Sequence, residues 1–240
     1  MLISAVFVPG APALVPEVSG VGSVELDPVR SAVADAVAAQ ADLSNAWWAV
    51  GPDDGDASGG QAMTAAGSFG GFGVDREVSL TPDPAASGRL PTSMLVAGWM
   101  RELTPAAARV VITPQTVPAD AGAERCRALG ERLAESAAGP VPTALLIVGD
   151  GAIHLGERAP GGGLDPDAAA LQREIDAALA GGDPASLRAL DWARCERWGV
   201  DGRGAWEVAA AALPGPMTAT VHYSGAPLGV GYNVVGWRSA

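Results

Sequence analysis

The sequence predicts a layered α/β domain, and three observations support this fold class. Apolar runs of strand length alternate with helical patterns along the chain. Several of these runs lack polar alternation, which is typical of strands covered on both faces. The 240 residues are 48% hydrophobic, which is ample for a sizeable core. Because no repeat, coiled coil or linker interrupts the pattern, we expect a single domain over residues 1–240.

The first part of the chain sets out this alternation. The run at 2–8 contains one polar residue and predicts a buried strand. A helix is expected at 26–43, where valines recur at every fourth position, and a second strand at 45–50. The segment 53–73 is rich in Gly, Ser and Asp and is long for a connection. It therefore predicts either a functional loop or a surface excursion.

The remainder of the chain continues the alternation. Residues 75–81 alternate in polarity and predict an edge strand. The next helix is expected at 91–103, with Thr92 or Ser93 as its cap. Further strands are expected at 109–114 and 143–148, two more strands within 217–237, and helices at 120–137, 166–183, 184–191 and 202–213.

Charge and composition exclude several classes of partner. The net charge of −12 disfavours nucleic acid and anionic membrane surfaces, because both would repel the chain. The two cysteines, Cys126 and Cys195, match no metal-ligand spacing and are expected to be free. No apolar segment is long enough to span a bilayer, so we expect a cytoplasmic protein without a membrane anchor.

Small and polar residues follow the most apolar runs. The segments "FVPG", "AVGPDDGD" and "LIVGDGAIH" each end a run, and "APLGVGY" near the C-terminus adds a fourth glycine-rich segment. Ligands of open α/β sheets bind outside the carboxyl ends of the strands. The sequence therefore predicts a ligand-binding cleft at these ends.

Together these segments resemble the class III extradiol ring-cleavage dioxygenases, specifically the LigB-type catalytic subunit and a short actinobacterial branch of it. The resemblance covers nearly the whole chain and is most specific in "LLIVGDGAIHLGERAPGGGLDPDAA" and "APLGVGYNVVGW". It implies a three-layer αβα sandwich around a mixed, mostly parallel sheet, and a possible homo-oligomer.

The resemblance also implies an Fe(II) centre held by two His and one carboxylate, with a further His as acid/base. In this family the two ligand histidines follow prolines at strand ends. Here Gly10 and Asp53 occupy those positions. The acid/base role maps approximately onto His154, which lies one residue further from Gly149-Asp150 than the usual spacing. Glu207 is one candidate for the carboxylate ligand, although it lies in a helical pattern typical of a solvated residue.

Less specific interpretations of the same segments remain open. Asp53, Asp54 and Asp56 together could hold a hard cation such as Mg²⁺ or Ca²⁺, although acidic turns are more often solvated. The "GDG" amides could bind an anion, although Asp150 argues against phosphate there. His222 lies within a strand pattern and is expected to be structural.

Two hypotheses follow. The first is an uncharacterised relative of these dioxygenases that lacks the ordinary Fe(II) site and binds a small molecule or partner in the strand-end cleft. The second is an active oxidoreductase, a ring-opening dioxygenase with an atypical metal-ligand set. No cofactor is expected, with Fe(II) or another divalent metal as the alternative. The candidate catalytic residues are His154 and Asp150, and the expected pocket residues are Pro9, Gly10, Pro52, Asp53, Gly149, Gly151, Gly229 and Tyr232.

Overall fold

The computed structural model describes residues 1–20, 23–54, 63–160, 162–213 and 215–239. Its main sheet has six strands in the order β5-β2-β6-β1-β8-β7. These strands are β1 (Leu2–Val8), β2 (Ala46–Asp53), β5 (Val111–Pro118), β6 (Thr143–Val148), β7 (Thr218–Gly225) and β8 (Tyr232–Arg238). Strands β5, β2, β6 and β1 are parallel, whereas β8 runs antiparallel to both β1 and β7. The expected mixed, mostly parallel sheet is confirmed.

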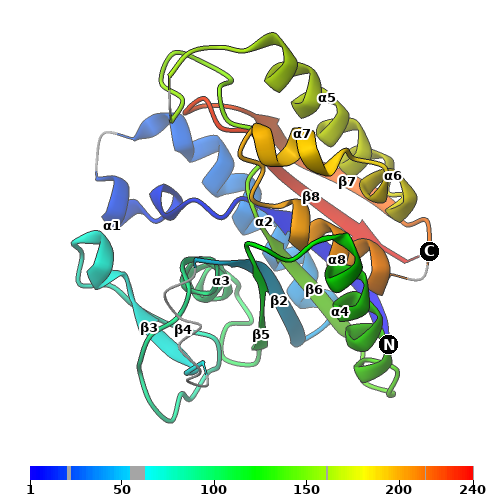
Figure 1. Cartoon of the computed structure of the whole chain (residues 1–240). Coiled ribbons are helices and arrows are strands. Elements are labelled where there is room, and N and C mark those ends of the chain that lie inside the picture. Colours follow the sequence, from blue (N-terminus) through cyan, green and yellow to red (C-terminus); the bar gives the residue numbers. More distant parts are fainter. Residues whose placement is uncertain (21–22, 55–62, 161, 214, 240) are drawn as a thin grey trace.

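Helices cover both faces of this sheet, as Figure 1 shows. One layer contains α2 (Asp27–Leu43) and α3 (Thr92–Glu102), preceded along the chain by the short α1 (Pro16–Ser19). The other layer contains α4 (Ala123–Ser136), α5 (Pro166–Gly181), α6 (Pro184–Arg188), α7 (Trp192–Arg197) and α8 (Arg203–Ala212). The three-layer αβα sandwich is therefore confirmed. Within the described ranges, no helix is long and apolar enough to cross a membrane.

Each face of the sheet contributes to its own hydrophobic core. Side chains alternate along a strand, so the adjacent Trp47 and Trp48 point to opposite faces. Trp47 packs in the core beneath α2 and α3, and Trp48 packs against the core beneath α4 to α8. Strand β6 is buried along its whole length, because it lies between β2 and β1 under both helix layers.

The edge strand expected at 75–81 is present, but it does not belong to the main sheet. β4 (Glu77–Ser79) instead pairs antiparallel with β3 (Ala66–Ser68) in a separate two-stranded sheet. Val78 is buried there at the point where Gly98 of α3 allows close approach. β3 also lies within the segment 53–73, which was expected to be a loop. Residues 55–62 of that segment are outside the described residues.

The prediction that Thr92 or Ser93 caps α3 was wrong. Pro91 occupies the N-cap position, and no side chain of Thr92 or Ser93 caps the helix. Asp54, which is remote in sequence, caps the helix instead. Its Oδ2 accepts hydrogen bonds from the backbone N–H (3.0 Å) and the hydroxyl (2.8 Å) of Thr92. Ser93 instead donates its hydroxyl to the Pro52 carbonyl at 2.7 Å. Helix α3 is thereby tied to the carboxyl end of β2.

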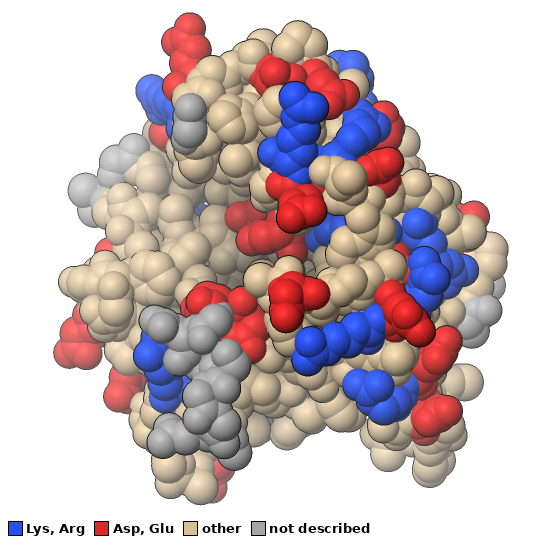
Figure 2. All heavy atoms as spheres, viewed as in Figure 1, with Lys and Arg blue, Asp and Glu red and all other residues tan. Residues whose placement is uncertain are grey.

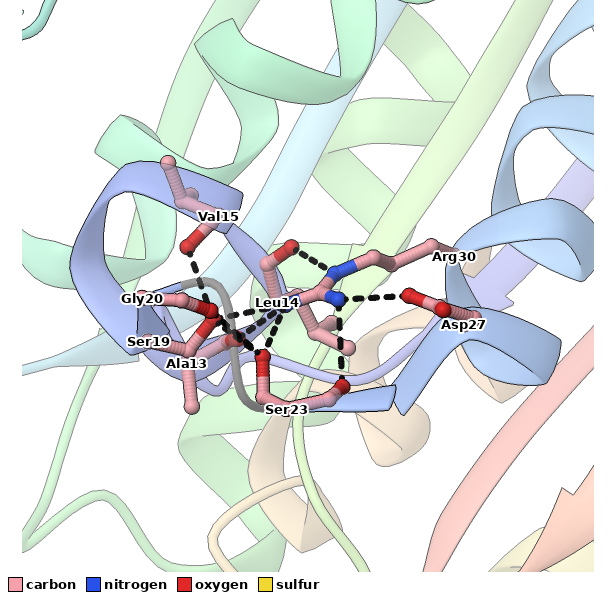
Figure 3. Close-up of polar contacts among 8 residues, drawn as sticks. All are labelled: Ala13, Leu14, Val15, Ser19, Gly20, Ser23, Asp27 and Arg30. Carbon is pink, nitrogen blue, oxygen red and sulfur yellow. Dashed lines mark hydrogen bonds and ion pairs between the residues drawn. The ribbon is translucent and has the colours of Figure 1, made fainter. Parts of the chain in front are cut away.

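Arg30 of α2 anchors the segment that follows β1, as Figure 3 shows. Its guanidinium donates to the carbonyls of Leu14 (2.9 Å) and Ala13 (3.2 Å) and to the hydroxyl of Ser19 (2.6 Å). It also pairs with Asp27 at 2.8 Å. Both carbonyls belong to the short helical turn at 12–14. Among the described residues, no other donor bonds to either of them. Arg30 therefore fixes the chain immediately after Gly10.

Candidate functional site

The chain topology opens a crevice at the carboxyl ends of the parallel strands. β1 leads into α2 on one face of the sheet, whereas β6 leads into α5 on the opposite face. The same divergence occurs at β2, which leads into α3, and its neighbour β5, which leads into α4. Neighbouring parallel strands whose connections leave in opposite directions form the usual ligand site of open α/β sheets. The expected strand-end site thus has its topological basis.

The ends of β1 and β6 are joined by hydrogen bonds. Gly10 donates its backbone N–H to Oδ1 of Asp150 at 2.7 Å. Gly149 donates its backbone N–H to the Val8 carbonyl at 2.9 Å. Gly10 and Asp150, two residues expected at the site, are thus in direct contact.

Asp201 joins this pair from the turn between α7 and α8. Its Oδ1 accepts a short hydrogen bond from the backbone N–H of Asp150. In return, the Gly202 N–H donates to the Asp150 carbonyl at 3.1 Å. Asp201 as a whole residue is exposed and Asp150 is half-buried, but the Asp201 carboxyl group is turned inward onto the Asp150 N–H, where it is partly removed from solvent.

Both carboxyl groups hold protons more tightly than ordinary aspartates. Desolvation raises the pKa of Asp201 to about 6. Desolvation, and then the charge of Asp201, raise the pKa of Asp150 well above its usual range, partly offset by the N–H groups of Gly10 and Ala11. The same two carboxyl groups, after desolvation, raise the pKa of the buried Tyr232 phenol. Because its pKa of about 6 lies close to neutrality, the Asp201 carboxyl group can be either a protonated donor or an ionised acceptor there.

A cleft of about 610 Å³ borders Asp201, whereas the expected catalytic residues Asp150 and His154 are not among its lining residues. It is bounded by the end of β2 at Pro52, the segment between β5 and α4, helix α7 and the start of α8. Its lining includes Asp201, Cys195 and Arg203. Figure 2 shows acidic side chains gathered in and around a hollow on the face that is viewed. The cleft therefore has an acidic border and a partly apolar wall.

Two side chains of the cleft are not reactive groups. Burial raises the pKa of the Cys195 thiol to about 11, so it stays protonated at neutral pH. Cys195 and Cys126 are both free and buried, which agrees with the expectation that they form no disulfide. The Arg203 guanidinium lies over the Trp192 ring, 4.3 Å from its centroid, and pairs with Glu207 at 2.8 Å. Arg203 therefore supports the wall.

The expected pocket residues divide into two groups. Pro52 lines the cleft, whereas Asp53 at the end of the same strand does not and accepts a hydrogen bond on Oδ2 from the hydroxyl of Thr116 at 3.4 Å. Pro9, Gly149, Gly151 and Gly229 are buried and do not line the cleft, and Gly10 does not line it either. Tyr232 is buried as well, and its pKa responds to the carboxyl pair.

The glycines after β6 allow close packing of backbone and do not form an anion site. Gly151 donates to the Gly231 carbonyl at 2.7 Å, and Gly231 donates to the Ala152 carbonyl at 2.8 Å. The Ala152 N–H donates to Oε1 of Gln172 at 2.8 Å. Because the N–H groups of the "GDG" turn all have protein acceptors, the anion-binding interpretation of this turn is wrong.

His154 lies in the loop that follows this turn. It has a positive φ of 63°, a left-handed conformation that non-glycine residues rarely adopt. Its Nδ1 donates to the Gly162 carbonyl at 2.8 Å, and its ring packs edge-on against Trp198. This tautomer leaves Nε2 as an acceptor. Among the described residues, no hydrogen bond joins His154 to Asp150, so the two candidate catalytic residues do not form one hydrogen-bonded unit.

Glu207 was expected as a solvated residue or as the carboxylate ligand, and the structure contradicts solvation. Its side chain is fully buried on α8. Its oxygens pair with Arg127 Nε at 2.6 Å and with Arg203 Nη2 at 2.8 Å. A buried carboxylate needs such partners because isolated burial of its charge is costly. Glu207 is therefore part of the contact between α8 and α4.

The remaining metal hypotheses concern the acidic turn after β2. Asp54 accepts hydrogen bonds from Thr92, as described above, and Asp56 lies outside the described residues. In the part of the chain that the structure describes, no three His, Cys, Asp or Glu side chains are grouped so that they could hold a metal ion.

Asp201 is the functional candidate that sequence reasoning missed. It lies in the turn "GVDG" between two short helices and follows no strand. The only local signal is an Asp-Gly pair, which is typical of any turn. Its position beside Asp150 arises from tertiary structure.

Comparison with solved structures supports the fold. The chain is similar to the crystal structure of the uncharacterized protein JW3007 from Escherichia coli K12, with a TM-score of 0.58 and 12% sequence identity. The similarity covers 99% of this chain and 100% of that chain. At this identity it shows the fold alone. No protein-family model and no curated protein sequence matches the chain.

Proposed function

We propose that this protein binds a small molecule in the strand-end cleft, beside the Asp150–Asp201 pair, and does so without the ordinary Fe(II) site. One observation carries this proposal: Asp201 lines the cleft, and its carboxyl group is tied to the end of β6 by the hydrogen bond that it accepts from the Asp150 backbone N–H. The cleft volume of about 610 Å³ lies within the range of small-molecule sites.

The charges around the cleft define the class of ligand. Asp120, Glu196 and Asp201 line it, and the chain as a whole carries a net charge of −12. An anionic ligand would be repelled by this surface. The Asp201 carboxyl group, whose pKa is raised to about 6, can act as a donor when protonated and as an acceptor when ionised, which suits hydroxyl, amide or amine groups. The preferred ligand is therefore neutral or cationic and polar at one end.

The residues at the positions that the family resemblance assigns to iron do not fit an Fe(II) centre. Gly10 has no side chain to act as a ligand. Asp53 is a harder ligand than imidazole. Both oxygens of Glu207 face arginines. The function that we propose therefore uses hydrogen bonding by the carboxyl pair.

A second candidate is an oxidoreductase with an atypical metal-ligand set, and His154 is the observation that favours it. Its left-handed conformation is held by the loop, as strained residues often are at functional sites. Metal analysis of protein purified without chelator, followed by Fe(II) reconstitution and assay with catechols, tests this candidate. Stoichiometric iron together with a yellow ring-fission product would replace the binding proposal.

Thermal-shift measurement with matched neutral, cationic and anionic small molecules tests the binding proposal. We expect stabilisation by neutral or cationic compounds and at least tenfold weaker binding in Asp201→Asn. Asp83→Asn, which changes an exposed carboxylate outside the cleft lining, is the matched control and should bind as the wild type does. Preferential binding of anions, or equal binding by Asp201→Asn, would contradict the proposal.

A further inference from the structure

A second cavity, of about 380 Å³, lies between helix α2 and the β1–β8–β7 side of the sheet. Ser4 and Gln40 line it, together with His222 of β7 and Arg238 of β8. Ser4 pairs with Arg238 in the first half of β1, whereas Gly10 follows the other end of that strand. The cavity is therefore separate from the strand-end cleft, and the lining residues of the two cavities do not overlap.

The wall of this cavity contains buried polar atoms without partners. Gln40 is 2% exposed, and neither its amide nitrogen nor its amide oxygen has a hydrogen-bond partner among the described residues. The hydroxyl of Ser4, also 2% exposed, lacks a described partner as well. An unsatisfied buried polar group costs about 1–3 kcal/mol, so such groups are rare and require an explanation.

The side chains around these atoms indicate the chemistry of a ligand. A primary amide presents a donor and an acceptor side by side, and it pairs in a bidentate manner with a planar edge that offers the reverse arrangement, as glutamine does with adenine. Asp42 of α2 and Arg238 of β8 contribute opposite charges to the lining of the cavity, which favours a ligand without net charge. Ala36, Ala39 and Leu43 supply an apolar surface for a flat ring.

We propose that this cavity binds a small, neutral, planar molecule with an adjacent donor and acceptor, such as a nucleobase or an aromatic carboxamide. The Gln40 amide forms the bidentate contact, and the Ser4 hydroxyl adds a third hydrogen bond. Because these atoms are closed to solvent, binding requires that the Gln40 side chain and the Ser4 hydroxyl both turn toward the cavity. The volume of about 380 Å³ is at the small end of ligand sites and suits a single ring system.

Binding to the full chain is measured by calorimetry with adenine, uracil and nicotinamide as probes, and with nicotinate as an anionic counterpart of nicotinamide. At least one neutral probe should bind, and nicotinate should not. Gln40→Leu keeps the approximate volume of the side chain but removes both partners of the bidentate contact, so it should weaken the neutral probe at least tenfold. It should also raise the melting temperature of the unliganded protein, because it removes unpaired buried polar atoms.

Two controls locate the effect. Gln115→Leu makes the same chemical change on β5, at the opposite edge of the sheet, and should bind the probe as the wild type does. Asp201→Asn should also retain it, which separates this cavity from the function proposed for the strand-end cleft. The proposal is overturned if no neutral probe binds, if Gln40→Leu binds as tightly as the wild type, or if Asp201→Asn abolishes binding.

Discussion

Gly10 donates its backbone N–H to the carboxylate of Asp150 at 2.7 Å, which links the carboxyl ends of β1 and β6. Gly10, for which the sequence resemblance implied an iron-ligand position, contributes a backbone donor. This donor partly offsets the rise in the pKa of Asp150 that burial and Asp201 cause. The strand end therefore positions a carboxyl group without a side chain of its own.

The carboxyl pair makes the stability of the fold depend on pH. An unfolded aspartate has a pKa near about 3.9, and in the native state the pKa of Asp201 is about 6. The native state therefore binds protons more tightly, so stability falls as the pH rises from 4 through 6. We expect Asp201→Asn to remove part of this fall, because the amide oxygen can still accept from the Asp150 N–H.

Urea unfolding at a series of pH values checks this prediction. Asp201→Asn should have nearly wild-type stability at pH 4 and greater stability than the wild type at pH 7.5. Asp83→Asn, an exposed control, should follow the wild-type curve. A constant difference between Asp201→Asn and the wild type at every pH would contradict the assigned role.

The two glycines at the strand ends should respond differently to alanine. A Cβ on Gly149 would lie 2.4 Å from the Gly202 backbone, whereas a Cβ on Gly10 would lie 3.4 Å from the nearest atom, Cγ1 of Val148. Gly149→Ala must therefore push away the turn that carries Asp201, at a cost of about 1–3 kcal/mol in the free energy of unfolding. Gly10→Ala should stay within about 0.5 kcal/mol of the wild type.

Chemical denaturation of both variants gives the comparison, and the pH dependence of Gly149→Ala gives a second readout. Displacement of Asp201 should reduce the fall in stability between pH 4 and 6. Equal stability of the two variants would show that the turn between α7 and α8 is not held against Gly149.

The strands and their ends could be predicted from the sequence because each signal is local. Apolar runs such as 143–148 stop at Gly or Pro, and a parallel sheet brings such ends to one edge. The contact of Gly10 with the segment after β6 follows from that geometry. The location of β4 was not predictable, since a three-residue strand carries no information about its partner.

The remainder of the site depends on tertiary contacts that no local pattern encodes. Asp201 reaches Asp150 only because α7 and α8 cross the strand ends. Glu207 appeared to belong to a solvated helix because sequence periodicity does not show that arginines from α4 and α8 would cover it. His154 was placed correctly in a strand-end loop, but the direction of its ring depends on the Gly162 carbonyl.

Arg30 should be a main determinant of the order of the chain after Gly10. Its side chain is 16% exposed and donates to Leu14, Ala13 and Ser19. Arg30→Met keeps much of the apolar stem but leaves these acceptors without their donor. Because hydrogen bonds to charged groups contribute about 1.5–3 kcal/mol each and are not additive, we expect a loss of about 2–4 kcal/mol in unfolding free energy.

Urea denaturation measures this loss, and amide hydrogen exchange within 11–19 measures the local effect. Exchange in this segment should accelerate more than exchange in β6. Arg132→Met is the matched control, since Arg132 is exposed and donates only to a carbonyl of its own helix. Unchanged exchange in Arg30→Met would mean that the segment is held by its apolar contacts alone.

Glu207 should be required for stability and should have no part in ligand binding at the cleft. Its side chain is fully buried and does not line the cleft, and it pairs with Arg127 and the buried Arg203. Glu207→Gln keeps the shape of the side chain but leaves the Arg203 charge without compensation. Removing one partner of a buried pair typically costs about 3–5 kcal/mol.

Arg127→Met, which removes a half-exposed partner, should cost less, because Arg203 still compensates Glu207. If the two variants were equally stable, or if Glu207→Gln lost ligand binding without losing stability, Glu207 would have to be assigned to the functional site.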